Sequence, residues 1–211
     1  FREFLAWIVE ANKKFIIIGN MNAITYKEVF PLIKANKMWL GYSIHSGDRE
    51  FEVPNDYPLA AVGWRIDENG RKFIRVKGVR WFTNIDHGRR HEPLPLMTMA
   101  DNLRFSKHKE LKGKTAYDRY DNYDAIEVPF TDAIPSDYDG VMGVPISFLD
   151  KYCPEQFEIL GITDRQNTSG VRTKKYTATD SPKYNDLNAR SVIKIGERYI
   201  PMYARLLIRR L

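Results

Sequence analysis

Cysteine is nearly absent from this sequence: Cys153 is the only one among 211 residues. A single thiol excludes an internal disulfide and any zinc site built from several cysteines, so a reducing, cytoplasmic setting is the expected location. Long apolar runs are missing as well, since no stretch approaches the roughly 20 apolar residues that a membrane-spanning helix needs. The sequence therefore predicts a protein without a membrane partner.

Glycine-rich phosphate-binding patterns are also missing. No Walker-type glycine pattern occurs, and no G-x-G-x-x-G sequence follows an expected strand. Serine and cysteine lack the flanking residues that mark a catalytic nucleophile. The sequence thus gives no motif for a P-loop nucleotide hydrolase, a dinucleotide enzyme or a nucleophilic hydrolase.

A metal site would have to use the histidine pair His87 and His91, together with Asp86 or Glu92. Their spacing of four residues suits one face of a helix, but Gly88 and the nearby prolines argue against a helix at this place. The two arginines between the histidines would repel a cation. No metal site is therefore expected.

Charge is present but unevenly distributed along the chain, whose net charge is +6. Residues 71–119 carry 13 basic and 5 acidic side chains, and residues 165–211 carry 11 and 3. Residues 120–164 between them carry 1 basic and 10 acidic side chains. Two basic blocks suit a surface that binds a polyanion such as nucleic acid. Alternatively the blocks pair with one another in the fold. Because phosphate repels carboxylates, much of the acidic block is expected either to lie away from DNA or to pair internally with the basic blocks.

The first forty residues alternate between helical and strand patterns. Apolar residues with amphipathic-helix spacing come first: Phe1, Phe4, Leu5, Ile8 and Val9. The run "FIIIGN" then predicts a strand buried on both faces of a parallel sheet. A capping box formed by Thr25 and Glu28 predicts a helix over "YKEVFPLIKAN", kinked or shortened at Pro31, and "KMWLGYS" predicts the next strand. This order is half of a doubly wound α/β sheet.

Shorter strands follow up to a domain boundary expected near residue 90. "EFEV", "GWRI", "KFIRV" and "VRWFTNI" are strand candidates, and Glu68-Asn69-Gly70 predicts a tight turn between the middle two. Residues 1–90 are expected to be the end of an α/β domain, and residues 91–211 a less regular α+β region. In the second region "SFLDKY" suggests a helix and "EQFEILGIT" a strand, and a final strand is expected within 199–211, at "YARLLIRR".

The end of one expected strand, in "KGVRWFTNIDHGRRHEPLP", combines aromatic and basic residues that suit nucleic acid. Trp81 and Phe82 offer rings on which a base can stack, and Asn84 and the Arg89-Arg90-His91 run offer hydrogen bonds and positive charge. Because side chains alternate along a strand, Trp81 and Phe82 point to opposite faces. At most one of the two rings is expected to do more than pack.

Seven segments together resemble the C-terminal portion of adenine-specific DNA methyltransferases of the EcoRI modification-enzyme type. The resemblance covers residues 1 to about 160 and returns at the end of the chain, and residues 164–198 match least. Its most specific parts are "YDNYDAI" and "DGVMGVPI", which no common fold pattern explains. The segments are "KKFIIIGNMNAITYKEVFPLIKANKMWLG", "RWFTNID", "RHEPLPL", "YDNYDAIEV", "IPSDYDGVMGVPISFL", "PEQFEIL" and "YARLLIRR".

The resemblance implies an enzyme that transfers a methyl group from S-adenosylmethionine to the N6 amino group of adenine in double-stranded DNA, after flipping the base out of the helix. In that family an Asn-Pro-Pro-Phe segment holds the flipped adenine, and a glycine-rich turn holds the cofactor. Neither segment occurs in this sequence, and the resemblance places both before Phe1. We therefore expect this chain to contain no catalytic residue, to bind little of the cofactor and to be inactive alone.

The implied fold is the C-terminal half of a Rossmann-like methyltransferase sheet, followed by an irregular α+β DNA-recognition region. Within it, Trp81 or Phe82 is expected to stack on the target base, and Asn84 lies beside them. Phosphate contacts are expected from Arg89, Arg90, His91, Lys107, Lys109, Lys112 and Lys114. Base-edge contacts are expected from Arg119, Asn122 and Arg172, because Asn suits adenine and Arg suits guanine.

An alternative function is a stand-alone module that binds DNA or another protein without catalysis. The two functions differ in what precedes Phe1: an Asn-Pro-Pro-Phe segment favours the methyltransferase, and a natural start codon favours the module. The sequence does not give the DNA site or the oligomeric state, because specificity also depends on loop geometry and DNA deformation.

Overall fold

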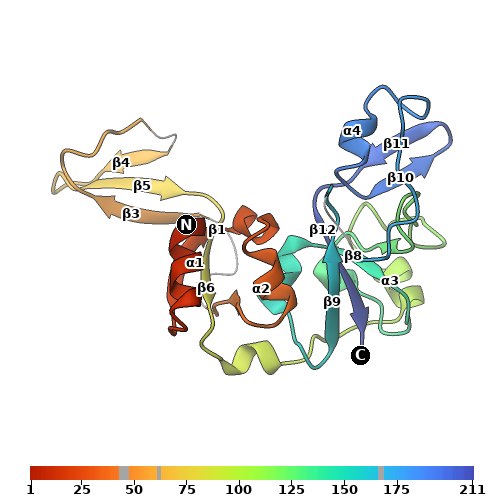
Figure 1. Cartoon of the computed structure of the whole chain (residues 1–211), viewed down its shortest axis with the longest axis horizontal. Helices are drawn as coiled ribbons and strands as arrows, with labels where there is room; N and C mark the ends of the chain where they lie inside the picture. The colour runs from red at the N-terminus through yellow and green to blue at the C-terminus, as the bar shows by residue number, and fades with distance from the viewer. Residues whose placement is uncertain (43–47, 61–62, 166–168) are drawn as a thin grey trace. The chain divides into compact units, whose positions relative to one another are not determined.

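The structure is a computed structural model that describes residues 1–42, 48–60, 63–165 and 169–211. The chain divides into two compact units, Phe1–His87 and Gly88–Leu211. Within the described ranges both units mix short helices with small sheets, so the fold is mixed α/β (Figure 1). Among these residues no helix is long and apolar enough to cross a membrane.

The first unit is built around a three-stranded sheet in the order β1-β6-β2. Helix α1 (Arg2–Glu10) leads into β1 (Ile16–Asn20), and η1 (Met21–Thr25) and α2 (Phe30–Lys34) connect β1 to β2 (Trp39–Leu40). The central strand, β6 (Val79–Thr83), is antiparallel to both neighbours. Strands β1 and β2 therefore run parallel to each other, joined by a helical crossover as in a βαβ unit. The helix–strand–helix–strand prediction is confirmed.

The prediction that "FIIIGN" is buried on both faces of a parallel sheet is wrong. Strand β1 lies at the edge of this sheet, and its residues alternate between exposed and half-buried. Ile16 and Ile18 are 58% and 44% exposed. A continuous apolar run does not by itself distinguish a central strand from an edge strand whose one face is open.

The start of the helix after β1 also differs from the prediction. Thr25 ends η1, where its hydroxyl donates to the Asn22 carbonyl at 2.9 Å, so it forms no capping box with Glu28. The side chain of Asn20 caps η1 instead, accepting from the Asn22 backbone N–H at 2.9 Å. The predicted shortening at Pro31 is confirmed, since α2 covers only Phe30–Lys34 and Pro31 occupies its first turn. A first-turn residue has no helical acceptor for its missing N–H, so the proline is accommodated there.

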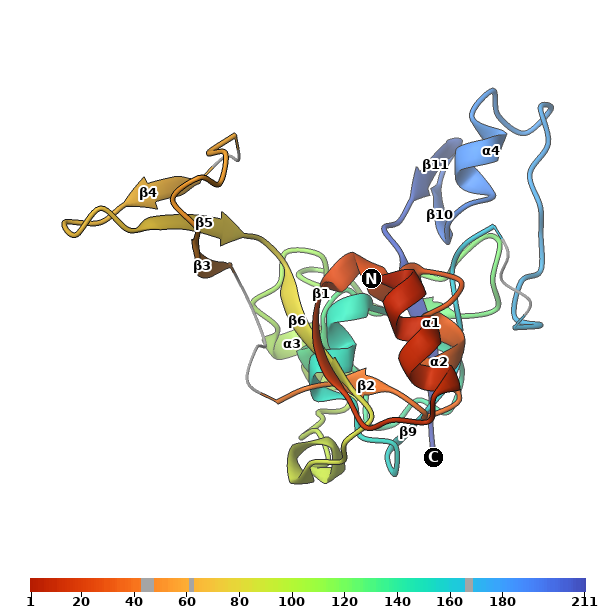
Figure 2. The same ribbon diagram turned by 60° about the vertical axis from the view of Figure 1, so that its left-hand side comes forward.

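A second sheet of the first unit is inserted between β2 and β6, in the order β3-β5-β4 (Figure 2). Its strands are β3 (Arg49–Val53), β4 (Trp64–Ile66) and β5 (Lys72–Val76), and all pairings are antiparallel. Gly70, at φ +76°, completes the turn between β4 and β5 and donates its N–H to the Asp67 carbonyl. The predicted strands and the predicted turn are confirmed here.

The second unit is centred on a four-stranded sheet in the order β7-β8-β12-β9. The strands are β7 (Ile126–Glu127), β8 (Met142–Pro145), β9 (Phe157–Ile162) and β12 (Arg205–Arg210). The predicted strands at "EQFEILGIT" and "YARLLIRR" are β9 and β12, and the helix expected at "SFLDKY" is the 3-10 helix η4 (Ile146–Lys151). The remaining elements are η2 (Gly88–His91), α3 (Met99–Phe105), η3 (Thr131–Ala133), α4 (Tyr184–Leu187) and the hairpin β10 (Val192–Ile195) to β11 (Arg198–Pro201).

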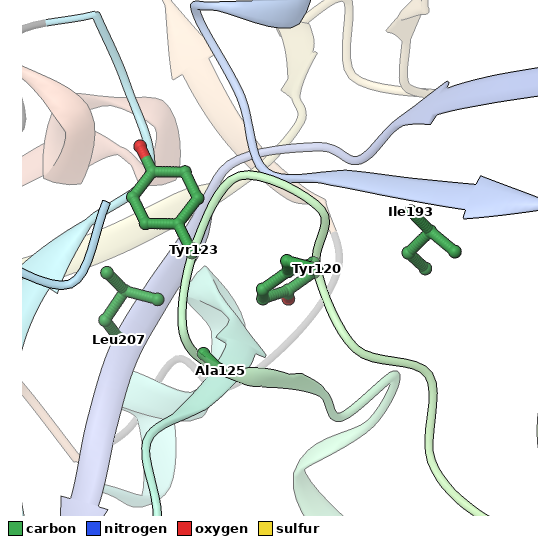
Figure 3. Packing of buried hydrophobic residues seen from close by; sticks show 5 residues of the cluster. All are labelled: Tyr120, Tyr123, Ala125, Ile193 and Leu207. Atoms are coloured by element: carbon green, nitrogen blue, oxygen red, sulfur yellow. The ribbon is translucent and has the colours of Figure 1, made fainter. Parts of the chain in front are cut away.

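The interior of this unit joins segments that are far apart in the sequence. Figure 3 shows Tyr120, Tyr123 and Ala125 from one loop packed with Ile193 of β10 and Leu207 of β12. The rings of Tyr120 and Tyr123 meet edge to face, with their centroids 6.4 Å apart. Buried aromatic pairs of this kind add stability beyond the area they bury, so the cluster ties the loop to the sheet.

A buried ion pair lies beside that cluster. The Arg205 guanidinium donates to both carboxylate oxygens of Glu127, the shortest of these bonds being 2.7 Å, and the Tyr120 hydroxyl donates to the same carboxylate. Burial raises the pKa of Tyr120 well above its usual value, and the Glu127 charge adds to this. Burial acts to lower the pKa of Arg205, but the contacts with Glu127 outweigh it and the pKa is raised. The Arg205 guanidinium therefore stays ionised while Tyr120 stays neutral.

The acidic block pairs with both basic blocks, as one of the two interpretations of the charge pattern predicts. Carboxylates of this block bind side chains from before and after it in the sequence. The pairs are His91–Glu155, His108–Asp132, Arg119–Asp124, Lys174–Asp121, Arg205–Glu127 and Arg209–Glu158. The four pairs with arginine or lysine neutralise Asp121, Asp124, Glu127 and Glu158 within the second unit itself.

Candidate functional site

The first unit contains a cavity of about 420 Å³ beside Trp81. Small-molecule sites in proteins commonly occupy about 300–1,000 Å³, so the cavity has a suitable size for a base. Its lining is mainly apolar and comes from β1, from the residues just after β2, from β6 and from the segment after β6. The lining residues are Ile16, Gly41, Tyr42, Trp81, Thr83, Ile85, Asp86 and His87.

Gly41 brings the backbone after β2 directly against Trp81. Its N–H donates to the Trp81 carbonyl at 2.9 Å. A Cβ atom at position 41 would lie 2.7 Å from the Trp81 Cβ, which is closer than side-chain carbons approach each other. Glycine is therefore required for this wall of the cavity, and the contact restricts where the Trp81 side chain can lie.

The segment after β6 is held in place by hydrogen bonds to the other strands. The Thr83 hydroxyl donates to the Phe15 carbonyl at 2.7 Å and accepts from the Ile85 N–H at 3.0 Å. His87 Nε2 lies 3.0 Å from the Leu40 carbonyl, which can only accept, so this nitrogen carries the proton. These bonds make the wall formed by Thr83, Ile85 and His87 part of the sheet rather than a free loop.

The two adjacent aromatics of β6 differ in burial. Phe82 is 0% exposed, and its ring meets that of Phe1 edge to face with centroids 5.2 Å apart. Trp81 is only partly buried and lines the cavity. The two side chains point to opposite faces of the strand, and of the two rings Trp81 is the one that a ligand in the cavity can touch.

Two asparagines among the predicted contact residues have both ends of the side-chain amide bound to backbone. Asn84 accepts from the Phe15 N–H at 2.9 Å and donates to the Lys13 carbonyl at 2.9 Å, which fixes the start of β1. Asn122 is 1% exposed, donates to the Arg190 carbonyl at 2.8 Å and accepts from the Val192 N–H at 2.9 Å. These side chains connect distant segments of the chain.

Arginines among the predicted contact residues are also engaged within the protein. Arg172 donates to the Tyr123 hydroxyl, with Nε at 3.0 Å, and to the Asp164 carbonyl. Arg119 donates to Asp124 at 2.7 Å but remains on the surface. Arg90 is only 8% exposed. Of these three, Arg119 is the most accessible to a partner.

The predicted phosphate-binding residues divide into exposed and paired groups. Lys107, Lys109 and Lys112 follow α3 in the sequence, and all three are exposed. Arg89 is 57% exposed and its Nε lies 3.6 Å from Glu92. The paired group consists of Lys114, bound to Asp118, and His91, whose Nδ1 lies 2.8 Å from the Glu155 carboxylate. The three lysines are thus the cations of this set that are most open to an anionic partner.

Cys153 lies beside a second cavity, of about 370 Å³, in the second unit. The thiol is 0% exposed and donates to the Glu155 carboxylate at 3.3 Å. Burial, together with this bond, raises the pKa of the thiol. The hydrogen bond from His91 lowers the pKa of the Glu155 carboxyl. Because a reactive cysteine needs a thiolate at neutral pH, Cys153 has the environment of a packed, protonated side chain.

Each histidine of the pair binds within its own unit: His87 binds the Leu40 carbonyl, and His91 binds Glu155. Within the described ranges no group of three His, Cys, Asp or Glu side chains could hold a metal ion. Sequence reasoning named none of the cavity residues Ile16, Thr83, Ile85, Gly41 and Tyr42 as site residues. The last two lie just after β2. Their only signal is a glycine followed by an aromatic at the end of a predicted strand, which is too common to identify a site.

The comparisons with known proteins relate the whole chain to one family. The family model described as adenine-specific methyltransferase EcoRI matches residues 1–211. The Type II methyltransferase M.EcoRI of Escherichia coli is 48% identical over 160 residues, which are 76% of this chain and 46% of that protein.

Two further relatives come from mycoplasmas. M.MgeORF184P, a Type II methyltransferase of Mycoplasma genitalium, is 35% identical over 162 residues, and M.MpnI, a Type II methyltransferase of Mycoplasma pneumoniae, is 32% identical over 163 residues. Each alignment covers 76% of this chain and 48% or 47% of the relative. The chain thus spans about half the length of the curated relatives it matches. No solved structure matches it significantly.

Proposed function

The chain belongs to the family of the adenine-specific methyltransferase EcoRI, and from this membership we propose that it is part of a DNA methyltransferase of a type II restriction–modification system. The reaction is the transfer of a methyl group from S-adenosylmethionine to N6 of an adenine in double-stranded DNA. The adenine is flipped out of the duplex, because its amino group is out of reach while the base is stacked. In the complete enzyme this chain supplies the end of the catalytic sheet and the region that recognises DNA.

The observation that carries the proposal is the cavity beside Trp81. A flipped base needs a pocket with an aromatic wall, and the cavity offers the partly exposed Trp81 ring, about 420 Å³ of volume and a mainly apolar lining. Stacking a base on such a ring contributes about 1–3 kcal/mol. We therefore assign stacking on the base to Trp81. Phe82 is buried and points to the opposite face of β6.

The residues present do not fit a complete cofactor site. The 211 residues contain neither an Asn-Pro-Pro-Phe segment nor a glycine-rich strand–turn pattern. The relatives are about twice as long as the part of them that aligns with this chain. We therefore assign the cofactor and the catalytic asparagine to a segment outside this sequence, and the chain alone is inactive as a methyltransferase. Its own role is to receive the base and to hold the duplex.

Contacts with the DNA backbone come from the exposed cations of the second unit. Lys107, Lys109 and Lys112 are exposed and close together in sequence, and Arg89 and Arg119 are on the surface beside their carboxylate partners. The internal pairing of the acidic block supports this role, since paired carboxylates repel phosphate less. Such contacts fix the position of the duplex without reading its sequence.

The test is a methylation assay with tritiated S-adenosylmethionine and unmethylated plasmid DNA. The 211-residue chain is compared with an enzyme that joins it to upstream segments of the family, which carry Asn-Pro-Pro-Phe and the cofactor turn. We expect label on adenine N6 from the longer enzyme alone and salt-sensitive DNA binding by both proteins. No label from the longer enzyme and no DNA binding by either would contradict the proposal and favour a protein-interaction module.

A further inference from the structure

The two faces of the β3-β5-β4 sheet, here called the arm, differ in chemistry. Residues that pair across antiparallel strands share a face. The pairings Phe51–Ile74–Trp64 and Val53–Lys72–Ile66 therefore lie on one face, together with Arg49–Val76 at its end. We call this the arm face, and its residues are Arg49, Phe51, Val53, Trp64, Ile66, Lys72, Ile74 and Val76.

The opposite face of the arm is neutralised by its own ion pairs. Arg65 donates to both carboxylate oxygens of Glu50, at 2.8 to 3.1 Å, and Arg75 Nε lies 3.3 Å from Asp48. The Arg65 guanidinium also lies over the Phe73 ring, 4.2 Å from its centroid. These charges and this aromatic ring are thus satisfied within the arm.

The arm face, in contrast, is mainly apolar and carries positive charge without negative charge. Its centre is covered, since Ile74 is 8% exposed, and Trp64, Ile66 and Val76 are 50%, 50% and 40% exposed. The other four residues of the face, Arg49, Phe51, Val53 and Lys72, are half-buried. Its charged members are the cations Arg49 and Lys72, and none of its eight residues is acidic.

The two cations of the arm face keep their charge available to a partner. Arg49 donates to the Asp48 carbonyl and Lys72 to the Asn55 carbonyl, and a neutral carbonyl does not cancel a positive charge. Exposed apolar surface that carries only positive charge suits a nucleic acid, which presents phosphates beside apolar sugars and base edges.

The connections of the arm place it close to the cavity along the chain. Val76, at the end of β5, precedes Trp81 by five residues, and Tyr42 precedes Arg49 by seven. Five residues span at most about 18 Å, and seven at most about 25 Å. Phosphates follow one another every ~3.4 Å along a DNA strand, so the arm is tethered within about five to seven nucleotides of the cavity.

We propose that the arm face binds double-stranded DNA beside the adenine held in the cavity. This inference rests on the proposed function, which puts DNA there, and assigns a contact surface that the family relationship does not. The Trp64 ring and its apolar neighbours pack against sugars and base edges in a groove. Arg49 and Lys72 bind the phosphates at the groove's border, which is the usual division of roles between apolar and cationic side chains on DNA.

The first test is photocross-linking with the 211-residue chain and a radiolabelled duplex. The photoreactive residue p-benzoylphenylalanine replaces Trp64 in one variant and Arg65 in a matched control, whose side chain lies on the opposite face of the same strand. We expect a DNA cross-link from position 64 and none from position 65. Circular dichroism checks that both variants keep the strand content of the unmodified chain.

The second test measures DNA affinity against salt concentration. Arg49→Gln and Lys72→Gln should each lower the slope of log affinity against log salt by about 0.9, because each removes one cation that binds a phosphate. Arg75→Gln, which removes a cation from the neutralised face, should leave the slope unchanged. Trp64→Ala should weaken binding about tenfold with no change in slope, since it removes apolar contact area and no charge.

The outcomes separate this inference from the proposed function. Cross-linking at position 64 together with reduced slopes for Arg49→Gln and Lys72→Gln supports the arm face as a DNA-binding surface. If the chain binds DNA but position 64 does not cross-link and the slopes are unchanged, the inference is overturned and the proposed function stands. If the unmodified chain does not bind DNA at all, the inference is overturned, and the methylation assay on the longer enzyme decides the proposed function separately.

Discussion

Gly41 and Trp81 lie so close together that no larger residue fits at position 41 without movement. We predict that Gly41→Ala lowers the free energy of unfolding by about 1–3 kcal/mol, the usual cost of forcing extra volume into a packed site. The reason is the 2.7 Å separation between the new Cβ and the Trp81 Cβ. Urea unfolding measures the change. Gly88→Ala is the matched control, because nothing lies within 4 Å of a Cβ at that position.

Asp121 gives the second unit a pH-dependent contribution to stability. Burial raises the pKa of its carboxyl, but hydrogen bonds from the Tyr176 hydroxyl at 2.7 Å and the Lys174 ammonium at 3.1 Å lower it more, so the net pKa is below its usual value. A lowered folded-state pKa stabilises the fold above the unfolded-state pKa of about 3.9, and this contribution disappears as the pH falls through the folded-state pKa.

We therefore predict that Asp121→Asn costs about 1–2 kcal/mol at neutral pH, because it replaces two charge-assisted hydrogen bonds with weaker ones. The cost should shrink as the pH falls below about 4, where the native carboxyl becomes protonated. Chemical unfolding of both proteins over a pH series measures the difference. A cost that does not vary with pH would contradict the assignment.

Single residues show what sequence reasoning can and cannot locate. The alternation rule placed Trp81 and Phe82 on opposite faces, because it depends only on neighbours along one strand, but it could not tell which ring would face the cavity. The roles of Asn122 and Asn84 could not be found in this way. Asn122 binds the backbone of Arg190 and Val192, which are 68 and 70 positions away, and no local pattern reports such a pairing.

Among the elements, β12 holds the second unit together. It pairs with both β8 and β9, and its Leu206, Leu207 and Ile208 are 0% exposed. We predict that removing residues 205–211 abolishes cooperative unfolding of the second unit, since it takes away the central strand and leaves Glu127 without its buried partner, which alone costs about 3–5 kcal/mol.

Hydrogen exchange followed by mass spectrometry measures this effect unit by unit. Residues 88–165 should lose protection in the truncated chain, whereas the first unit should keep the protection that it has in the intact chain. Retained protection in β8 and β9 would contradict the central role of β12.

The elements were predicted best where local chemistry decides the structure. The strands of the arm and its Gly70 turn follow from alternation and from the one residue type that adopts a positive φ easily. The environment of β1 could not be predicted, because an apolar run has the same composition in a covered strand and in an edge strand. The capping box failed because Asn20, five residues earlier, already caps a 3-10 helix.

At the scale of the whole molecule, ion pairs join the acidic block to the basic blocks, and Lys107, Lys109 and Lys112 remain exposed. We predict that replacing Lys107, Lys109 and Lys112 together with glutamine lowers the slope of log DNA affinity against log salt by up to about 2.7, or about 0.9 for each phosphate that is no longer bound. Fluorescence anisotropy with a labelled duplex measures the slope. Lys151→Gln is the control, because it removes an exposed cation from within the acidic block. An unchanged slope in the triple variant would place the DNA elsewhere.

Sequence patterns could indicate a polyanion partner but not which carboxylates remain free. Pairs such as Arg205–Glu127 join residues 78 positions apart, so the neutralisation of the acidic block depends on the tertiary fold. The cavity is likewise assembled from segments between Ile16 and His87. From the sequence, these segments could be related to one another only as parts of one family pattern, and their contact in a cavity depends on the tertiary fold.

The most direct test of the role of Trp81 is the rate of methyl transfer to adenine N6 by the longer enzyme after Trp81→Ala. Removing a stacking interaction worth about 1–3 kcal/mol predicts a rate lower by a factor of about 5 to 150, and Trp81→Phe should recover most of it because an aromatic face remains. Tyr203→Ala, which removes an aromatic ring that is 81% exposed, should leave the rate unchanged. Equal rates for Trp81→Ala and the unmodified enzyme would contradict the assignment of this cavity to the target base.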